Sequence, residues 1–206
     1  MNSKIKNDII KDFITIPTSF PIDKEKPWLI VSKLDEILKE MIEKLDNEYK
    51  ISEGVALHKT AVIGNNVTIK APAIISAECF VGSNSYLRNG VYMAPRAKVG
   101  ISCEVKTSVL LEDSAIAHFN FVGDSIIGHN VNIEAGAILC NHYNEREDDT
   151  VYIHYGGERI STELHKFGSI VGDDCRIGAN AVLSPGTLLP PHTIVRRLEL
   201  IEQDSL

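Results

Sequence analysis

The chain has 206 residues, and its 28 acidic and 21 basic side chains give a net charge of −7, which argues against a general nucleic-acid binder with a basic surface. Apolar residues make up 44% and charged residues 24%, so a wholly disordered chain is excluded. No stretch reaches the roughly 18 consecutive apolar residues of a membrane span, and no apolar signal-peptide run follows the N-terminus. We therefore expect a cytoplasmic protein that binds neither nucleic acid nor membrane.

Residues 1–50 are predicted to form a helical segment of their own. Pro27 suits the first turn of a helix, and an apolar stripe follows it at Val31, Leu34, Leu38, Met41, Leu45 and Tyr49. The stripe predicts one amphipathic helix of about twenty residues. We interpret this helix as a cap on one end of the next domain, where unpaired strand edges need cover. An oligomerisation or partner-binding arm is the alternative.

A repeat of six residues begins after this segment. Every sixth residue is aliphatic, in the order Leu57, Ile63, Ile69, Ile75, Val81, Leu87, Met93, Val99, Val105 and Leu111. A small residue stands four positions after each, and the pattern returns at Val171, Ile177, Leu183, Leu189 and Val195. This period suits neither a helix nor an alternating strand. It predicts an all-β fold, a triangular prism of short parallel strands with aliphatic residues inside and small residues at the corners. Scattered strands of another all-β fold are the alternative.

Two kinds of interruption break the hexads. The steps 117–121 and 122–126 each read as five residues, and the pattern then stops between Asn141 and about Phe167. The second interruption holds a strand-like stretch and a turn, at 151–153 and at Gly156-Gly157. We therefore predict that residues 51–206 form a β-helix with an inserted loop at about 142–167. A loop of this length is usually functional or disordered. In the functional case we expect it to protrude from one coil and reach a neighbouring subunit.

Two basic residues occupy the position after an interior aliphatic residue, where many other hexads have glycine. Arg88 and Lys106 are one three-hexad coil apart, so we expect them to stack on one edge of the prism. At a strand spacing of about 5 Å, two cations repel unless an anion lies beside them. This arrangement favours a phosphate or diphosphate site. The alternative is a pair of solvated basic residues paired with Glu104 and Glu112.

His118 lies in the first shortened hexad, and the hexad count places it on the edge next to Arg88 and Lys106. An imidazole beside an anion site suggests a general base, because histidine exchanges protons near neutral pH. A structural histidine is the alternative.

Metal chemistry is not expected. The four cysteines occur singly, without a CxxC, and we expect reduced buried thiols. Four further histidines show no clustered ligand spacing, at His129, His142, His154 and His165.

Three stretches between Lys106 and Asn141 carry a more specific signal. They read Ala-His-Phe-Asn-Phe-Val-Gly-Asp at 117–124, Asn-Val-Asn-Ile-Glu-Ala-Gly at 130–136 and Cys-Asn at 140–141. With the hexads from about residue 57 to 195, they resemble the left-handed parallel β-helix of the hexapeptide-repeat acyltransferases. The resemblance is greatest to the acetyltransferase domain of bifunctional glucosamine-1-phosphate acetyltransferase/N-acetylglucosamine-1-phosphate uridyltransferase, and extends to related sugar-nucleotidyltransferase C-terminal domains.

This resemblance implies roles for particular residues. His118 falls on the general base that deprotonates the sugar 2-amino group before it attacks the acetyl-CoA thioester, and Asn141 falls near the same reacting centre. Substrate contacts fall on Arg88, Lys106, Phe121, Asn132 and Lys166, with the two cations holding the sugar phosphate.

The resemblance also implies where the acyl donor binds. A backbone N–H near Ala135 is the expected donor to the developing oxyanion. Coenzyme A is expected near Ala179 and beyond, between adjacent subunits of a homotrimer.

Some residues depart from the family pattern. Phe121 stands where the bifunctional enzyme has a sugar-contacting tyrosine, and Ala179 where it has a serine. The loop after Asn141 is longer, and no Gly-rich nucleotide-binding signature occurs.

The main hypothesis is therefore an acetyl-CoA-dependent acyltransferase acting on the amino group of a phosphorylated or nucleotide-linked amino sugar. A catalytically silent β-helical assembly or regulatory subunit, and a sugar O-acyltransferase, are the alternatives.

Overall fold

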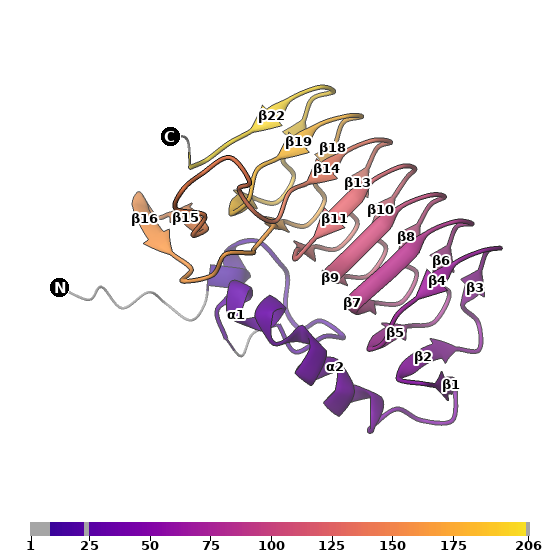
Figure 1. The fold of residues 1–206 in the computed structure, drawn as a ribbon. Coiled ribbons are helices and arrows are strands. Elements are labelled where there is room, and N and C mark those ends of the chain that lie inside the picture. Colours follow the sequence, from indigo (N-terminus) through magenta and orange to yellow (C-terminus); the bar gives the residue numbers. More distant parts are fainter. Residues whose placement is uncertain (1–8, 23–24, 205–206) are drawn as a thin grey trace.

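The computed structural model describes residues 9–22 and 25–204, and within them short strands wind into a parallel β-solenoid with flat faces (Figure 1). One face is a seven-stranded parallel sheet, which we name sheet B. Its strands are β3 (Val62–Ile63), β6 (Phe80–Val81), β8 (Lys98–Val99), β10 (Ala115–Ile116), β13 (Asn132–Ile133), β18 (Arg176–Ile177) and β21 (Ile194–Val195). The predicted β-helix is confirmed, while its left hand stays an implication of the resemblance.

The other two faces share a 13-stranded sheet, because β7 (Tyr86–Met93) and β9 (Glu104–Leu110) each continue around a corner. The second face holds β4 (Thr68–Ile69), the first halves of β7 and β9, β11 (Phe121–Gly123), β14 (Ile138–Leu139), β19 (Val182–Leu183) and β22 (Leu200–Ile201). The third face holds β2 (Val55–His58), β5 (Ala73–Ile75), the second halves of β7 and β9, β12 (Ile126–Ile127), β17 (Ser169–Val171) and β20 (Thr187–Leu189). Strand β1 (Tyr49–Ser52) pairs antiparallel with β2.

The interior is the aliphatic column that the hexads predict. From Ile75 to Val195 these side chains form one buried cluster, with Cys79, Cys103 and Cys175 at corner positions. Burial raises the pKa of the Cys79 thiol to about 12, which suits a packing role rather than a reactive one.

The corners are made by residues in the left-handed backbone region. Asparagine and aspartate tolerate this region better than other non-glycine residues, and they occupy many of the corners, at Asn66, Asn84, Asn89, Asn130, Asn180, Asp113, Asp124 and Asp174.

One of the two predicted short steps is wrong. The first five-residue step runs from Val105 to Leu110, not over 117–121. The register shifts between β7 and β9, so Leu110 joins the interior and Leu111 packs outside it. The second runs from Val122 to Ile127, as expected. Each shortened corner is turned by a single left-handed residue, Thr107 at φ 46° or Asp124 at φ 45°.

At Gly100 the coils approach too closely for any side chain. A Cβ built there would lie 1.5 Å from the Ala117 carbonyl oxygen and 3.1 Å from His118 Nδ1. Gly100→Ala is therefore expected to separate these coils and to lower the free energy of unfolding by about 1–3 kcal/mol, which urea titration would measure. An unchanged unfolding midpoint would contradict this close approach.

The N-terminal segment differs from the predicted single helix. A 3₁₀ helix η1 (Ile9–Asp12) precedes α1 (Pro27–Ser32) and α2 (Leu34–Ile42), and the predicted helix is interrupted at Lys33. Leu45 and Tyr49 lie beyond α2, and Tyr49 begins β1.

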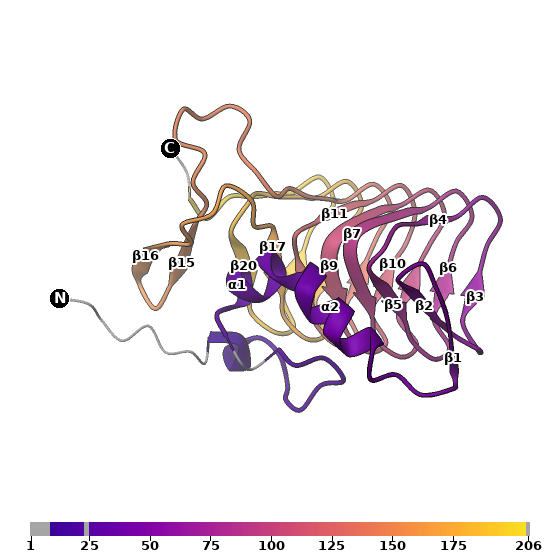
Figure 2. The same cartoon turned by 60° about the horizontal axis from the view of Figure 1, so that its bottom comes forward.

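These elements do not cap an end of the solenoid. They lie along its third face (Figures 1 and 2), where Trp28, Leu34 and Leu38 pack in one buried cluster with outward-facing residues of the strands, namely Ile74, Tyr92, Val109, Ile126, Ile170 and Leu188. The amphipathic stripe is real, but the surface that it covers is a flank, so the end-cap interpretation is wrong.

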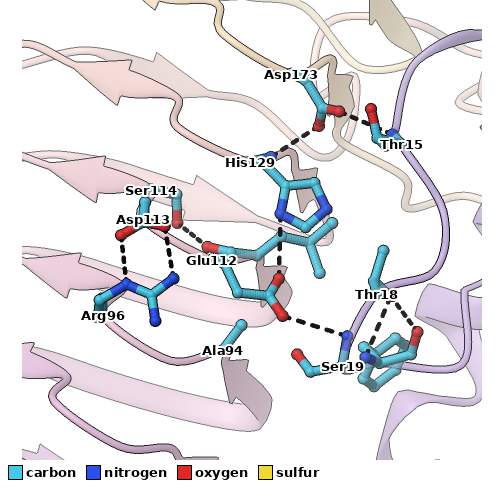
Figure 3. Close-up of polar contacts among 12 residues, drawn as sticks. Thr15, Thr18, Ser19, Ala94, Arg96, Glu112, Asp113, Ser114, His129 and Asp173 are labelled. Carbon is cyan, nitrogen blue, oxygen red and sulfur yellow. Dashed lines mark hydrogen bonds and ion pairs between the residues drawn. The ribbon is translucent and has the colours of Figure 1, made fainter.

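Two carboxylates of the solenoid fix the segment before α1 (Figure 3). Asp173 accepts from the backbone N–H groups of Thr15 and His129, both at 2.8 Å, and Glu112 accepts from the N–H of Ser19 at 3.3 Å. His129 Nδ1 lies 3.2 Å from Glu112 Oε2, so Glu112 pairs with His129 and not with a cation of the predicted anion site.

The inserted loop contains the expected strand and turn. Strands β15 (Tyr152–Tyr155) and β16 (Glu158–Ser161) form an antiparallel hairpin around the turn at Gly156-Gly157. The loop stands out beside the later coils (Figure 2) and is held within its own chain by Asp204, which accepts from Arg146 and Arg159. Among the described residues, no helix is long and apolar enough to cross a membrane.

Candidate functional site

Arg88 and Lys106 are register partners on β7 and β9, so the predicted stacking is confirmed. Each cation nevertheless has a carboxylate of its own chain. Arg88 pairs with Glu104 at 2.6 Å, and Lys106 Nζ lies 2.5 Å from Asp124 Oδ2. The repulsion that suggested an anion between them is therefore already relieved. Of the two glutamates expected as alternative partners, Glu104 does pair with Arg88, whereas Glu112 lies beside His129.

Lys106 belongs to a compact polar cluster at the shortened corners, which we name the corner cluster: Lys106, Asp124, Asn141 and His142. Asn141 Nδ2 donates to Asp124 Oδ2 at 2.5 Å, and His142 Nδ1 lies 3.2 Å from Asn141 Oδ1. Lys106, Asp124 and Asn141 are 6–9% exposed, whereas His142 is exposed. A buried carboxylate thus joins a buried ammonium and a buried amide, with an imidazole at the surface.

Two further predicted substrate residues flank this cluster. The ring of Phe121 lies against Gly123, where a Cβ would be 2.8 Å from it, and a Cβ at Gly123 would also be 3.0 Å from that of Asn141. Lys166 is exposed and directly precedes Phe167, whose N–H donates to the Asn141 carbonyl at 3.0 Å. The end of the inserted loop therefore returns beside its beginning.

His118 lies on the neighbouring corner, between sheet B and β11. Its side chain is exposed, and its carbonyl accepts from the N–H of Gly136 on the next coil at 2.8 Å. Ala135 in turn accepts from Asn180, and Ala179 from Leu198, each at 3.0 Å. His118, Ala135 and Ala179 therefore stand in one column, coil above coil.

His118 and the corner cluster are at opposite ends of β11. Gly123, the register partner of Lys106, is five positions after His118, and such a segment spans at most about 17 Å. No hydrogen bond or ion pair joins the His118 side chain to Lys106 or Asn141 among the described residues. This fits the predicted placement on neighbouring edges.

Asn132 lies apart from both groups, exposed on β13 in sheet B. It lines a groove over the later coils together with Glu134, Arg176, Ile194, Arg196 and Arg197. Arg197 pairs with Glu134 at 3.0 Å, while Arg176 and Arg196 have no ion-pair partner among residues 9–22 and 25–204. The groove therefore offers positive charge next to the column of Ala135 and Ala179.

The sequence predicted no role for Asp124 or these arginines, and it named His142 only as a histidine without metal-ligand spacing. A signal for Asp124 was available, since it lies one coil beyond Lys106 and one coil before Asn141, within the 117–124 stretch. Arg176 and Arg196 lie in none of the sequence stretches that carry the resemblance. In the described part of the chain, no three His, Cys, Asp or Glu side chains gather closely enough to hold a metal ion.

Comparison with known proteins identifies the family to which this chain is related. The family model described as the GMPPB C-terminal domain matches residues 69–203. The bifunctional sugar-1-phosphate nucleotidylyltransferase/acetyltransferase of Sulfurisphaera tokodaii is 31% identical over 189 residues, which cover 89% of this chain and 46% of that protein. The bifunctional protein GlmU of Methanococcus vannielii is 28% identical over 88% of this chain and 44% of its own length.

A third relative, the bifunctional protein GlmU of Carboxydothermus hydrogenoformans, is 36% identical over 133 residues, or 63% of this chain and 28% of that protein. The chain thus spans about half the length of the first curated relatives it matches. It belongs to the GMPPB C-terminal domain family, as a hexapeptide-repeat, acetyltransferase-like domain related to those of bifunctional sugar nucleotidylyltransferase/acetyltransferases.

Proposed function

We propose that this chain is an acyltransferase that moves an acetyl group from acetyl-CoA to the amino group of a phosphorylated or nucleotide-linked amino sugar. The observation that carries the proposal is the placement of an exposed imidazole, His118, at one end of β11 and of the corner cluster at the other end. A base and a polar, cation-containing site are the two features that such an acceptor requires.

In the proposed reaction, the amino nitrogen attacks the thioester carbonyl carbon as His118 takes its proton. The tetrahedral intermediate then collapses, the C–S bond breaks, and the sulfur of coenzyme A leaves as a thiol with the proton that His118 returns. The Ala135 N–H makes no hydrogen bond among those of the described residues, so it is free to donate to the developing oxyanion.

The sheet B groove supports an anionic donor. Arg176 and Arg196 offer guanidinium groups that bind phosphates well, and the small side chains of Ala135 and Ala179 leave room for an acyl chain beside His118. Exposed apolar side chains on the same corner and faces, at Phe119, Ile194 and Leu198 with 63%, 69% and 79% exposure, favour the association of copies in a homotrimer.

For the acceptor, we propose that Lys106 and Arg88 contact the phosphate, with Phe121 and Lys166 around the sugar and Asn141 near the reacting centre. Asn132 lies apart from these residues on sheet B, so its proposed sugar contact would come from a neighbouring copy of the chain. An arriving phosphate must compete with Glu104 and Asp124 for the two cations.

That competition also favours the second candidate, a catalytically silent assembly or regulatory subunit. A chain that already satisfies both cations internally, and that has Phe121 where the family has tyrosine, needs no ligand for stability. Calorimetry separates the candidates, because a silent subunit gives no heat with acetyl-CoA or with any sugar phosphate.

Thiol release tests the proposal directly. With acetyl-CoA, glucosamine 1-phosphate or a nucleotide-linked amino sugar is expected to accelerate thiol release, and the matched 2-hydroxy sugar is not. Faster release with the 2-hydroxy sugar would indicate an O-acyltransferase instead. Release at the acceptor-free rate with every amine would contradict the proposed function.

A further inference from the structure

The corner cluster is organised around Asp124, a residue to which the proposed chemistry gives no task. Asp124 turns the second shortened corner with a φ of 45°, and its side chain is 9% exposed. Its N–H donates to the Lys106 carbonyl at 2.9 Å, and its own carbonyl accepts from Gly168 at 2.8 Å. The backbone of this aspartate thus joins the preceding coil to the end of the inserted loop.

Its carboxylate has a more specific effect on Asn141. Asp124 Oδ2 lies 2.5 Å from both Lys106 Nζ and Asn141 Nδ2. A carboxylate can only accept hydrogen bonds, so it holds the NH₂ end of the Asn141 amide toward itself. The carbonyl end, Asn141 Oδ1, is thereby held on the other side, within 3.2 Å of exposed His142.

The same carboxylate compensates a buried charge. Lys106 is 9% exposed, and an ammonium at that depth is costly without an ionic partner. Asp124 therefore keeps Lys106 in place at the cluster while leaving the net charge of the pair at zero. An anion that reaches this corner meets a fixed ammonium rather than a mobile one.

We propose that Asp124 is a positioning residue for acetyl transfer: it fixes the orientation of the Asn141 amide and the place of Lys106 without touching the reacting atoms. This inference rests on the proposed function for its catalytic consequence, but the contact between Asp124 and Asn141 can be measured without activity.

The chain offers a matched control at another corner. Asp113 also has a left-handed backbone, with φ 62°, and also pairs with a cation of the preceding coil, Arg96, at 2.7 Å. Both partners are about half exposed, and no proposed site residue contacts them. Asp113→Asn therefore removes an equivalent corner carboxylate outside the site.

The first measurement follows the side-chain amide of Asn141 by NMR in protein labelled with ¹⁵N-asparagine. Asp124→Asn is expected to shift this signal, because its hydrogen bond to an ionised acceptor is lost, and Asp113→Asn is expected to leave it in place. If Asp124→Asn fails to fold because Lys106 is left unpaired, Lys106→Met with Asp124→Asn removes both charges and is expected to show the same shift. An unchanged Asn141 signal in the folded variant would overturn the inference.

The second measurement compares rates. Asp124→Asn is expected to lower kcat roughly tenfold or more, with the KM for acetyl-CoA unchanged, but to cause less than about a twofold further loss in an Asn141→Ala background. A merely structural role would lower the rate equally in both backgrounds, which would overturn the inference. A wild-type protein that transfers no acetyl group would contradict the proposed function, while the Asn141 signal would still decide the contact.

Discussion

Replacement of His118 by alanine is expected to lower kcat for acetyl transfer by roughly a hundredfold to ten-thousandfold, the usual range for loss of a general base. His118 is exposed, and its ring contact among the described residues is with Phe119 at 6.4 Å, so little packing is lost. The backbone of the corner remains held by the hydrogen bond from Gly136. Stability is therefore expected to change by less than about 0.5 kcal/mol, and the KM for acetyl-CoA by little.

Initial rates of thiol release at saturating acceptor would measure this loss. His58→Ala is the control, because His58 is a half-buried histidine that lies on β2 in the first coil, far from β11. It is expected to retain the wild-type rate. A His118→Ala rate within threefold of wild type would show that another group takes the proton.

The largest effect on stability is expected at Asp204, which joins the C-terminal tail to the inserted loop. Its side chain is 4% exposed and accepts from Arg146 at 2.9 Å, from Arg159 at 2.6 Å and from His154 at 3.1 Å. Arg146 is itself 6% exposed and stacks on Tyr143, with 3.4 Å from its Cζ to the ring centroid. Asp204→Ala leaves this buried guanidinium without its main partner, so the free energy of unfolding is expected to fall by about 3–5 kcal/mol.

The effect of Asp204 is expected to depend on pH. Burial opposes ionisation of this carboxyl, but hydrogen bonds from Arg159, His154 and Arg146 outweigh it and lower its pKa to about 2. Since the folded-state pKa lies below the unfolded value of about 3.9, the stabilisation is complete above pH 4 and is lost as the pH falls to about 2. The difference between wild type and Asp204→Ala is therefore expected to shrink over that range.

Urea titrations at several pH values would measure both effects. Asp149→Asn is the control in the same loop, because Asp149 and its partner His165 are 46% and 71% exposed, and an exposed pair contributes less than about 1 kcal/mol. Equal losses for Asp204→Ala and Asp149→Asn at pH 7 would contradict the assignment of Asp204 as the anchor of the loop.

The interior of the fold was predictable because its physical cause is periodic. An aliphatic residue that recurs every six positions can be buried on every face of a triangular coil, and the buried cluster follows this series from Ile75 to Val105. The prediction failed first at Leu111. The hexad pattern does not show that a single residue, Thr107, turns its corner, whereas two residues, Asn89 and Gly90, turn the equivalent corner one coil earlier.

The place of the N-terminal helices was not predictable from their own sequence. An apolar stripe shows that one side of a helix must be covered, but not by what. The missing information lies in the outward residues of the third face, such as Ile74, Tyr92 and Val109, which are apolar in every coil, whereas sheet B mixes apolar residues such as Phe80 and Ile194 with Lys98, Asn132 and Arg176. A comparison of the faces, coil by coil, would have placed the helices on this flank.

The site was predictable in part. The coil period placed Arg88 and Lys106 on one edge and His118 on the neighbouring edge, whereas only the resemblance pointed to Asn141. The pairing of Lys106 with Asp124 was not predicted, because the carboxylates expected beside the two cations were Glu104 and Glu112, and Asp124 stands at a shortened corner whose register the hexads do not fix. The groove with Arg176 and Arg196 was missed because it forms only when residues on either side of the inserted loop meet on sheet B.

Mass spectrometry of the product tests most directly whether this β-helix transfers an acetyl group to an amine. With [¹³C]acetyl-CoA and either glucosamine 1-phosphate or a nucleotide-linked amino sugar, we expect a labelled N-acetyl product from at least one acceptor, and its formation is expected to require His118. The absence of label from both acceptors after complete incubation, or label on a hydroxyl group with the amine still free, would contradict this transfer.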